Sequence, residues 1–234
     1  MKILVFSDIH GSLNGLKELL KSKDYNSADR VIFLGDVAFG ASRPNECIEL
    51  LNNSKAVCLL GNNDSYICYG IPNSELDEFG AGKLKQYEYM DSVISLKSKQ
   101  DLKSWQRELY ISIDGKKLYF THYPWERDEL GDLVVIDDEK FASLANCQKM
   151  FADVDADYIF FGHEHRAYNF SDKNKNFYCL DTFGLKKQGN YLMIRIEDGH
   201  LSVEEKSLEF DIAEEIKLMD KAGYPYDKKK IKKD

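Results

Sequence analysis

The chain has 234 residues, of which 43% are hydrophobic and 31% charged, a composition ordinary for a globular protein that buries a sizeable core. Its net charge of −8 disfavours non-specific nucleic-acid binding, which requires a basic surface. The charge is unevenly spread, because residues 228–234 carry five lysines and one aspartate, a net +4, which leaves −12 for residues 1–227. We therefore predict one domain over residues 1–227, followed by a basic tail over residues 228–234.

The cysteines and the apolar runs indicate the cellular compartment of the protein. The five cysteines are odd in number and form no Cys-x-x-Cys pair, which favours a reducing compartment without disulfides. The apolar run at the amino terminus is too short for a signal peptide, and no stretch approaches the length of a membrane span. These features predict a cytoplasmic protein without membrane association.

The first third of the chain alternates short apolar runs with helical patterns. Continuous apolar runs are typical of strands buried on both faces, and here they occupy residues 3–6, 31–34 and 56–60. Helices are expected between them, over residues 13–21 and 45–51, the second opened by Pro44 in its first turn. Strand, helix, strand, helix, strand predicts a parallel sheet with right-handed crossovers.

The remaining elements are more varied. Residues 65–101 show no clean period and are expected to form helices and loops on one side. A hairpin is predicted around Asp114-Gly115, because Asp-Gly suits a tight primed turn. Further along we expect a helix at 138–150, a buried strand at 158–161, three antiparallel strands at 177–181, 191–196 and 201–208, and a helix at about 212–222. The fold class is α/β with mixed sheets.

Metal-ligand residues follow five of the apolar strands, each at the carboxyl end. Ligands in open α/β sheets gather where the strands end, so we expect these side chains to converge. Four of the five histidines are used in this way, whereas His200 follows an Asp-Gly turn and is predicted to lie on the surface. The set is Asp8 and His10, Asp36, Asn62, His122, and His163 with His165.

In this order the motifs Asp-x-His, Gly-Asp, Gly-Asn-x-Asp, His and Gly-His-x-His resemble the calcineurin-like metallophosphoesterase superfamily. The segment 35–40, Trp105 ahead of the hairpin, and the ending Ala222-Gly223-Tyr224-Pro225 are similar to the small bacterial and archaeal phosphodiesterase branch. The resemblance covers nearly the whole chain. It implies a four-layer α/β/β/α sandwich with two mixed sheets.

The resemblance also implies two divalent metal ions. One would be held by Asp8, His10, Asp36 and His165, and the other by Asp36, Asn62, His122 and His163, with Asp36 bridging. Mixed oxygen and imidazole ligands suit manganese, iron or zinc better than calcium, and we favour manganese. Two such ions, about 3.5–4 Å apart, would generate a metal-bridging hydroxide that attacks phosphorus.

The chain departs from the family pattern at Asn63. There the family has a histidine, thought to protonate the leaving group and to be oriented by the aspartate that corresponds to Asp64. An amide has no proton to give near pH 7, so Asn63 cannot act as a general acid. Asn63 and Asp64 are therefore the candidate catalytic positions. We expect hydrolysis of phosphodiesters or phosphoanhydrides with good leaving groups rather than alkyl monoesters.

Other features bear on the substrate, which we expect to be a small phosphate ester or a nucleotide. Tyr123 and Trp125, after His122, offer rings for stacking on a base, although loop packing is an equal use for them. Arg43 and Arg166 lie one loop from ligands and are candidates for phosphate binding. The run at 180–184 is closer to phosphoprotein phosphatases and diadenosine tetraphosphatases than to the phosphodiesterase branch. A phosphomonoesterase or protein phosphatase, a dinucleoside polyphosphatase and a non-catalytic scaffold therefore stay open.

Overall fold

Two mixed five-stranded sheets form the centre of the molecule. A computed structural model describes residues 1–76, 79–128, 131–135 and 142–226. The first sheet has the order β12-β11-β1-β2-β3, and its strands are β1 (Lys2–Phe6), β2 (Arg30–Phe33), β3 (Ala56–Cys58), β11 (Gln188–Glu197) and β12 (His200–Glu209). The predicted parallel arrangement of β1, β2 and β3 is confirmed, and β11 and β12 extend the sheet antiparallel.

The second sheet has the order β4-β5-β8-β10-β9. Its strands are β4 (Glu108–Ile113), β5 (Lys116–Thr121), β8 (Tyr158–Phe161), β9 (Tyr168–Ser171) and β10 (Asn176–Cys179). β5, β8 and β10 are parallel, whereas β4 and β9 pair antiparallel at the two edges. Of the three antiparallel strands expected at 177–181, 191–196 and 201–208, the first is antiparallel to β9 but parallel to β8, and it belongs to the second sheet rather than to that of β11 and β12. A short hairpin, β6 (Trp125–Arg127) with β7 (Leu133–Val135), follows β5.

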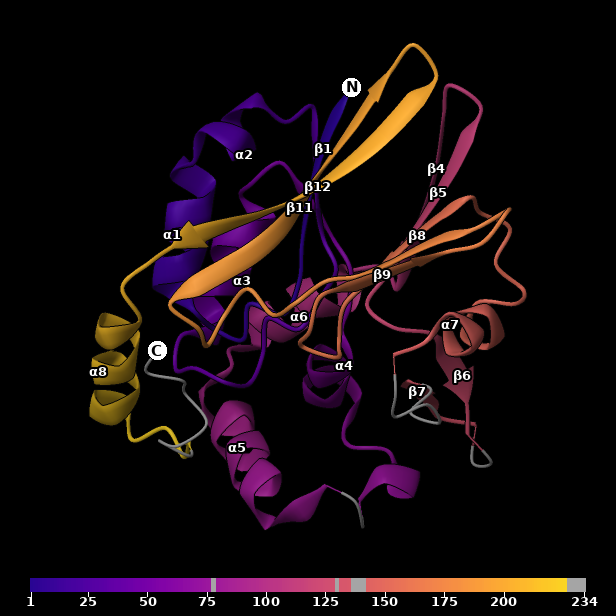
Figure 1. Cartoon of the computed structure of the whole chain (residues 1–234). Helices are drawn as coiled ribbons and strands as arrows, with labels where there is room; N and C mark the ends of the chain where they lie inside the picture. The colour runs from indigo at the N-terminus through magenta and orange to yellow at the C-terminus, as the bar shows by residue number, and fades with distance from the viewer. Residues whose placement is uncertain (77–78, 129–130, 136–141, 227–234) are drawn as a thin grey trace.

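Helices cover the outer faces of both sheets, which gives the four layers that the family resemblance implies (Figure 1). They are α1 (Leu13–Lys21), α2 (Lys23–Ser27), α3 (Pro44–Asn52), α4 (Asn62–Tyr69), the 3-10 turn η1 (Asn73–Glu75), α5 (Gly80–Val93), α6 (Leu96–Ser104), α7 (Leu144–Met150) and α8 (Ile212–Ala222). Of the predicted helix at 138–150, residues 142 and 143 precede α7 and residues 138–141 lie outside the described part, as does the basic tail at 228–234.

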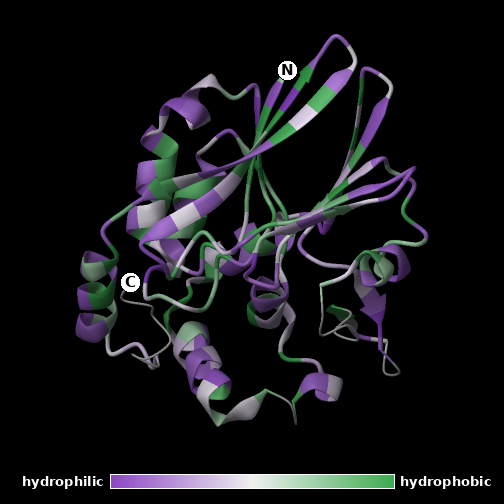
Figure 2. Cartoon of the chain, viewed as in Figure 1, coloured by the Kyte–Doolittle hydropathy of each residue, from purple (hydrophilic) through white to green (hydrophobic). Residues whose placement is uncertain are grey.

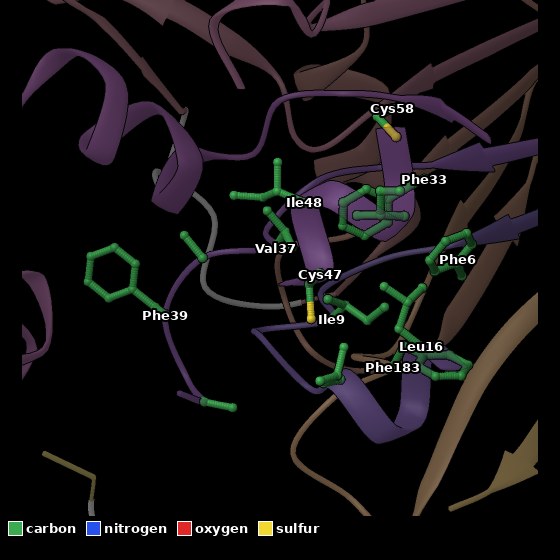
Figure 3. Packing of buried hydrophobic residues seen from close by; sticks show 14 of the residues in the cluster. Phe6, Ile9, Leu16, Phe33, Val37, Phe39, Cys47, Ile48, Cys58 and Phe183 are labelled. Carbon is green, nitrogen blue, oxygen red and sulfur yellow. The ribbon is translucent and has the colours of Figure 1, made fainter. Parts of the chain in front are cut away.

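Strand alternation places the core in separate layers. Ile3 and Val5 of β1 face the second sheet, while Leu4 and Phe6 face the helices of the first layer. Figure 2 shows the apolar residues concentrated along the strands and on the inner faces of the helices. In Figure 3 Phe6 lies between Phe33 and Phe183 and contacts both rings. A second apolar cluster lies between the sheets, and a third lies under α7.

The segment without a clear period forms α4, α5 and α6. In α5 the only fully buried residue is Met90, so this helix has almost no apolar stripe for a sequence pattern to reveal. Its position nevertheless matters for the site, because it faces the carboxyl ends of the strands of the first sheet (Figure 1).

Candidate metal centre

Two groups of candidate metal ligands lie at the strand ends. The first combines Asp8 and His10, after β1, with His165, after β8, and the second combines Asp36, after β2, with His122 and His163, after β5 and β8. Within each group the potential ligand atoms lie within 4.8 Å of one another. Each group therefore draws side chains from both sheets.

In the first group three side chains point at one place. The Nε2 atom of His165 lies 3.1 Å from Oδ1 of Asp8 and 2.8 Å from Nε2 of His10. His10 is oriented by its other ring nitrogen, Nδ1, which is 3.2 Å from the carbonyl oxygen of Ala38. An outer-shell partner of this kind is typical of metal-binding histidines.

The side chains of the second group also point at one place. Nε2 of His122 lies 3.3 Å from Oδ2 of Asp36, and the Asn62 amide oxygen lies 3.0 Å from both Nε2 of His122 and Nδ1 of His163. The amide oxygen of Asn62, at the start of α4, thus lies beside this group, and its part as an oxygen ligand remains a prediction. The position of Asp36 as a bridge to the first group remains a prediction.

Backbone conformation also sets the ligand positions apart. Five of the seven have positive φ angles, a left-handed conformation that non-glycine residues rarely adopt. They are Asp8 (55°), His10 (49°), Asp36 (62°), His163 (73°) and His165 (53°). Such strain concentrates at functional sites, because the surrounding structure must enforce it. Here it turns each side chain away from its strand and toward the shared centre.

Two neighbouring glycines allow the loops to approach one another closely. A Cβ atom on Gly61 would collide with the Asp36 carboxylate, and one on Gly162 would collide with Ser7 and Asp8. These positions need glycine because no side chain fits between the two ligand loops.

The buried charges interact strongly. Burial alone would raise the pKa of Asp36, but His122 outweighs it and holds that pKa at about 2. Burial lowers the pKa of His122, yet the carboxylates of Asp36 and Asp8 raise it to about 9. Burial and the charge of His122 lower the pKa of His163 to about 4. Two buried carboxylates surrounded by imidazoles form an environment that favours cations.

Asp64 lies beneath the ligand loops rather than in the open centre. Its carboxylate accepts hydrogen bonds from four backbone N–H groups: Asp36 at 2.8 Å, Val37 at 3.0 Å, Ala38 at 2.9 Å and Gly61 at 3.1 Å. Burial and the charge of Asp36 raise its pKa to about 7. These contacts fix the loop after β2 against the loop after β3, and they support a positioning role for Asp64.

Asn63 faces the centre. Its backbone N–H donates to Oδ1 of Asp36 at 2.9 Å, and its side-chain amide donates to Oδ2 of the same carboxylate. Asn63 therefore orients a ligand, and it also lines the cavity above the centre.

That cavity has a volume of about 850 Å³ and is the largest of those described. Its floor is formed by the ligands, and its walls by α5, the segment 182–186 and the segment after α8. Three lysines line it, Lys83, Lys85 and Lys186, of which Lys186 is paired with Asp181 at 2.6 Å. Sequence reasoning missed all three lysines, and for Lys83 and Lys85 the reason is that nothing in the exposed pattern of α5 marks its position over the strand ends.

The C-terminal segment closes one side of the cavity. The backbone N–H of Gly40 donates to the Tyr224 hydroxyl at 2.7 Å, and Gln86 of α5 donates to the carbonyl oxygen of Pro225 at 3.0 Å. The segment after α8 is thereby attached both to α5 and to the loop that carries Asp36.

The predicted substrate residues lie outside the cavity lining. Arg43 pairs with Glu46 at 2.7 Å, and Arg166 pairs with Glu164 at 2.5 Å. Tyr123 is buried, and its ring lies 4.6 Å from that of His163. Their part in substrate binding remains a prediction. Arg166 and Tyr123 contact the loop that carries His163 and His165, whereas the partner of Arg43 lies in α3.

None of the helices in the described part of the chain combines the length and apolar character needed to cross a bilayer.

Several relatives in sequence are known. The chain is 28% identical over 166 residues to the uncharacterized protein MJ0912 of Methanocaldococcus jannaschii, a match that covers 70% of this chain and 62% of that protein. It is 28% identical over 127 residues to a symmetrical bis(5'-nucleosyl)-tetraphosphatase of Actinobacillus pleuropneumoniae, covering 52% of this chain and 44% of that enzyme. The matches thus span less than two thirds of the length of either relative.

Solved structures share the fold. A metallophosphoesterase from Sphaerobacter thermophilus superposes with a TM-score of 0.73 at 20% identity, covering 99% of this chain and 97% of that one. The hypothetical protein PH1004 from Pyrococcus horikoshii superposes with a TM-score of 0.79 at 13% identity, covering 98% and 96%. The model of the calcineurin-like phosphoesterase family matches residues 1–167, which include all seven ligand positions. The chain belongs to the calcineurin-like phosphoesterase family.

Proposed function

We propose that this protein is a dinuclear metal-dependent phosphoesterase that hydrolyses phosphodiester or phosphoanhydride bonds. The observation that carries the proposal is the convergence of two ligand groups on the floor of one large cavity. Asp8, His10 and His165 would hold one divalent ion and Asn62, His122 and His163 the other, with Asp36 shared. Oxygen and nitrogen ligands in this mixture suit manganese, iron or zinc, and of these we propose manganese.

When bound, two such ions would supply Lewis-acid activation of water and charge stabilisation at phosphorus. The protein contributes the rest. Asp64 holds the two ligand loops in register through four backbone hydrogen bonds. Asn63 fixes the rotamer of Asp36. The cavity positions the phosphoryl group over the ligands, which is the main task of a protein in phosphoryl transfer.

Leaving-group chemistry follows from Asn63. Its amide already donates to Asp36 and has no ionisable proton, so it supplies no acid for an alkoxide. General acid catalysis is typically worth about 10²–10⁴-fold, so substrates with poor leaving groups lose most. Phosphoanhydrides and activated diesters leave without that help, which supports them as the substrates.

The cavity supports a dinucleoside polyphosphate as a second, more specific candidate. Lys83 and Lys85 place positive charge on the walls of a cavity whose volume is about 850 Å³, and Lys186, paired with Asp181, lines it as well. Several linked phosphates would satisfy this charge better than a single monoester does. The similarity to a symmetrical bis(5'-nucleosyl)-tetraphosphatase supports the same class.

A substrate panel tests the proposal. Purified protein with added manganese is assayed on an activated aryl diester, an alkyl phosphate monoester and diadenosine tetraphosphate. We expect turnover of the diester or the tetraphosphate at least 10-fold above that of the alkyl monoester. Faster monoester turnover would refute the preference, and no turnover with manganese, iron or zinc would indicate a binding scaffold instead.

Asn63→His is the matched gain-of-function variant. If the missing acid limits the reaction, this substitution raises alkyl monoester turnover about 10-fold or more while the activated diester changes little. Asn53→His, on the surface after α3, serves as the control. No gain in Asn63→His would show that another group already protonates the leaving oxygen.

A further inference from the structure

A second pocket is lined by later residues of α4, Ser65 and Tyr69, whereas the large cavity is lined by the first two, Asn62 and Asn63. The second pocket is also lined by the turn that follows this helix, by Arg107 before β4, and by Arg127 and Asp132 of the β6–β7 hairpin. We call it the Arg107 pocket. Its volume is about 300 Å³, and it shares no lining residue with the cavity above the metal ligands. Small-molecule sites begin at about this size.

Arg107 has an unusual environment. Its guanidinium lies 5.3 Å from the ring centroid of Trp125 and 5.8 Å from that of Tyr69. The Nε atom is buried and has no acceptor among the described residues. No described carboxylate lies within ion-pair distance of Arg107 or Arg127, although Arg43, Arg166 and Arg195 each have such a partner. Arg107 is thus a cation held in place by aromatic rings rather than by an anion.

A second buried donor lies beside it. The indole Nε1 of Trp125 also lacks an acceptor among the described residues. Buried donors are nearly always paired. Arg107 lines the pocket, whereas Trp125 lies against its guanidinium and is not among the lining residues. The unpaired Nε of Arg107 therefore indicates that an acceptor binds in the pocket. Arg127 adds a further cation, since it donates through one nitrogen to the carbonyl oxygen of Gly131 at 2.6 Å and keeps its other donors.

Part of the remaining lining is apolar, and Ser65 and the Asp132 carboxylate line the pocket as well. Tyr69 is 58% exposed, and Ile71 and Pro72 line the pocket next to it. Lys103 lies 5.6 Å from the Tyr69 ring centroid and adds positive charge to this face of a chain whose net charge is −8. An anionic end on the arginines and an apolar end on Tyr69 match a small phosphorylated ligand with a ring.

We propose that the Arg107 pocket is a second binding site, distinct from the metal centre, for a nucleoside monophosphate. Its phosphate would accept hydrogen bonds from Arg107 and Arg127, and its nucleoside would contact Tyr69, Ile71 and Pro72. Along α4, the Arg107 pocket lies close to the candidate metal ligands. Ser65 is three residues after the metal-ligand candidate Asn62, about 4.5 Å along the axis of α4.

The two tryptophans provide the test. The indole N–H of Trp105 donates to Asn52 at 3.0 Å, within the first layer, whereas that of Trp125 borders Arg107. A two-dimensional ¹H–¹⁵N correlation spectrum of the metal-loaded protein resolves one indole signal for each, and Trp125→Phe assigns them. Titration with AMP should shift the Trp125 signal saturably and leave the Trp105 signal in place. An unmoved Trp125 signal would overturn the proposal.

Variants locate the ligand. Arg107→Gln should weaken AMP binding about 10-fold or more, because it removes charge-assisted hydrogen bonds. Arg127→Gln, at an exposed position, should weaken it in the same direction, and it carries the test if the Arg107 variant fails to fold. Arg195→Gln, whose partner Glu204 lies on β12, should have no effect.

Two further arms separate this site from the metal centre. Asp36→Asn should leave the AMP-induced shift of Trp125 unchanged, and its loss in that variant would assign AMP to the metal centre instead. Adenosine, which lacks the phosphate, should bind at least 10-fold more weakly than AMP. Equal binding of adenosine would overturn the role of the arginines.

Discussion

Glu215 is a completely buried carboxyl group that should make stability depend on pH. It lies on α8, and its Oε2 atom accepts the backbone N–H of Asn14, at the start of α1, at 3.2 Å. Its Oε1 atom is buried and has no partner among the described residues. Burial raises the pKa of Glu215 to about 7, although the N–H of Asn14 and the charge of Arg43 act in the opposite direction.

The sign and size of the effect follow from this pKa. Between pH 4.5 and 7 the folded protein holds a proton that the unfolded chain has released, so the free energy of unfolding falls as the pH rises through this window. The full contribution is present below pH 4.5 and is lost above pH 7. A rise in pKa from 4.5 to about 7 corresponds to about 3 kcal/mol.

Glu215→Gln removes the ionisation while it keeps the shape and one acceptor. We expect the variant to match the wild type within about 1 kcal/mol at pH 5 and to exceed it by about 2–3 kcal/mol at pH 8. Urea denaturation, followed by circular dichroism at pH 5, 6, 7 and 8 with equal metal content, measures the difference. At m values of about 1–3 kcal/mol/M the midpoint at pH 8 should rise by about 1 M or more.

Glu214→Gln is the matched control, because Glu214 is the preceding residue on the same helix and its side chain is 48% exposed. Its difference from the wild type should be small at every pH. If the stability of Glu215→Gln differed from the wild type by the same amount at pH 5 and at pH 8, the reasoning from burial would be refuted.

Three further outcomes are expected. Asp36→Asn should lower the content of bound transition metal, measured by mass spectrometry, to a small fraction of the wild-type content. The surface variant Asp153→Asn should retain the metal. Retention of the metal by both variants would contradict the ligand assignment. Phe183→Ala removes a fully buried ring whose centroid lies 6.0 Å from that of Phe6 and 5.9 Å from that of Phe210. The free energy of unfolding, measured by urea denaturation, should fall by about 3–5 kcal/mol. A fall of less than about 1 kcal/mol would argue against tight packing at this position. Tyr224→Phe removes the acceptor of the Gly40 N–H, so it should cost about 1 kcal/mol of stability and raise KM, and an unchanged KM would separate this contact from the cavity.

Local sequence patterns predicted where several strands end and which side chains converge there. Continuous apolar runs marked β1, β2 and β8, and a polar residue two positions after such a run indicates the end of a strand without any long-range information. Asp8, Asp36 and His163 were identified on this basis, and the structure brings each of them into a ligand group.

Other features depend on contacts between distant segments. β9 has the burial pattern of a half-exposed edge strand, and nothing local distinguishes it from a loop. Glu215 looks like a surface residue on an amphipathic helix until α8 packs on the start of α1. Lys83 and Lys85 line the cavity only because α5 lies above the strand ends. The sequence pattern of one segment does not indicate which distant segment it will contact.

The two ligand groups also have a mechanical consequence. Asp8, His10 and Asp36 follow strands of the first sheet, while His122, His163 and His165 follow strands of the second. Ions held there would cross-link the two sheets, which otherwise meet through apolar side chains. Ligand concentrations about 1,000-fold above the dissociation constant add about 4 kcal/mol to folding stability. Metal would then do more than support catalysis: it would couple the unfolding of one half of the molecule to that of the other, and neither sheet alone would retain it.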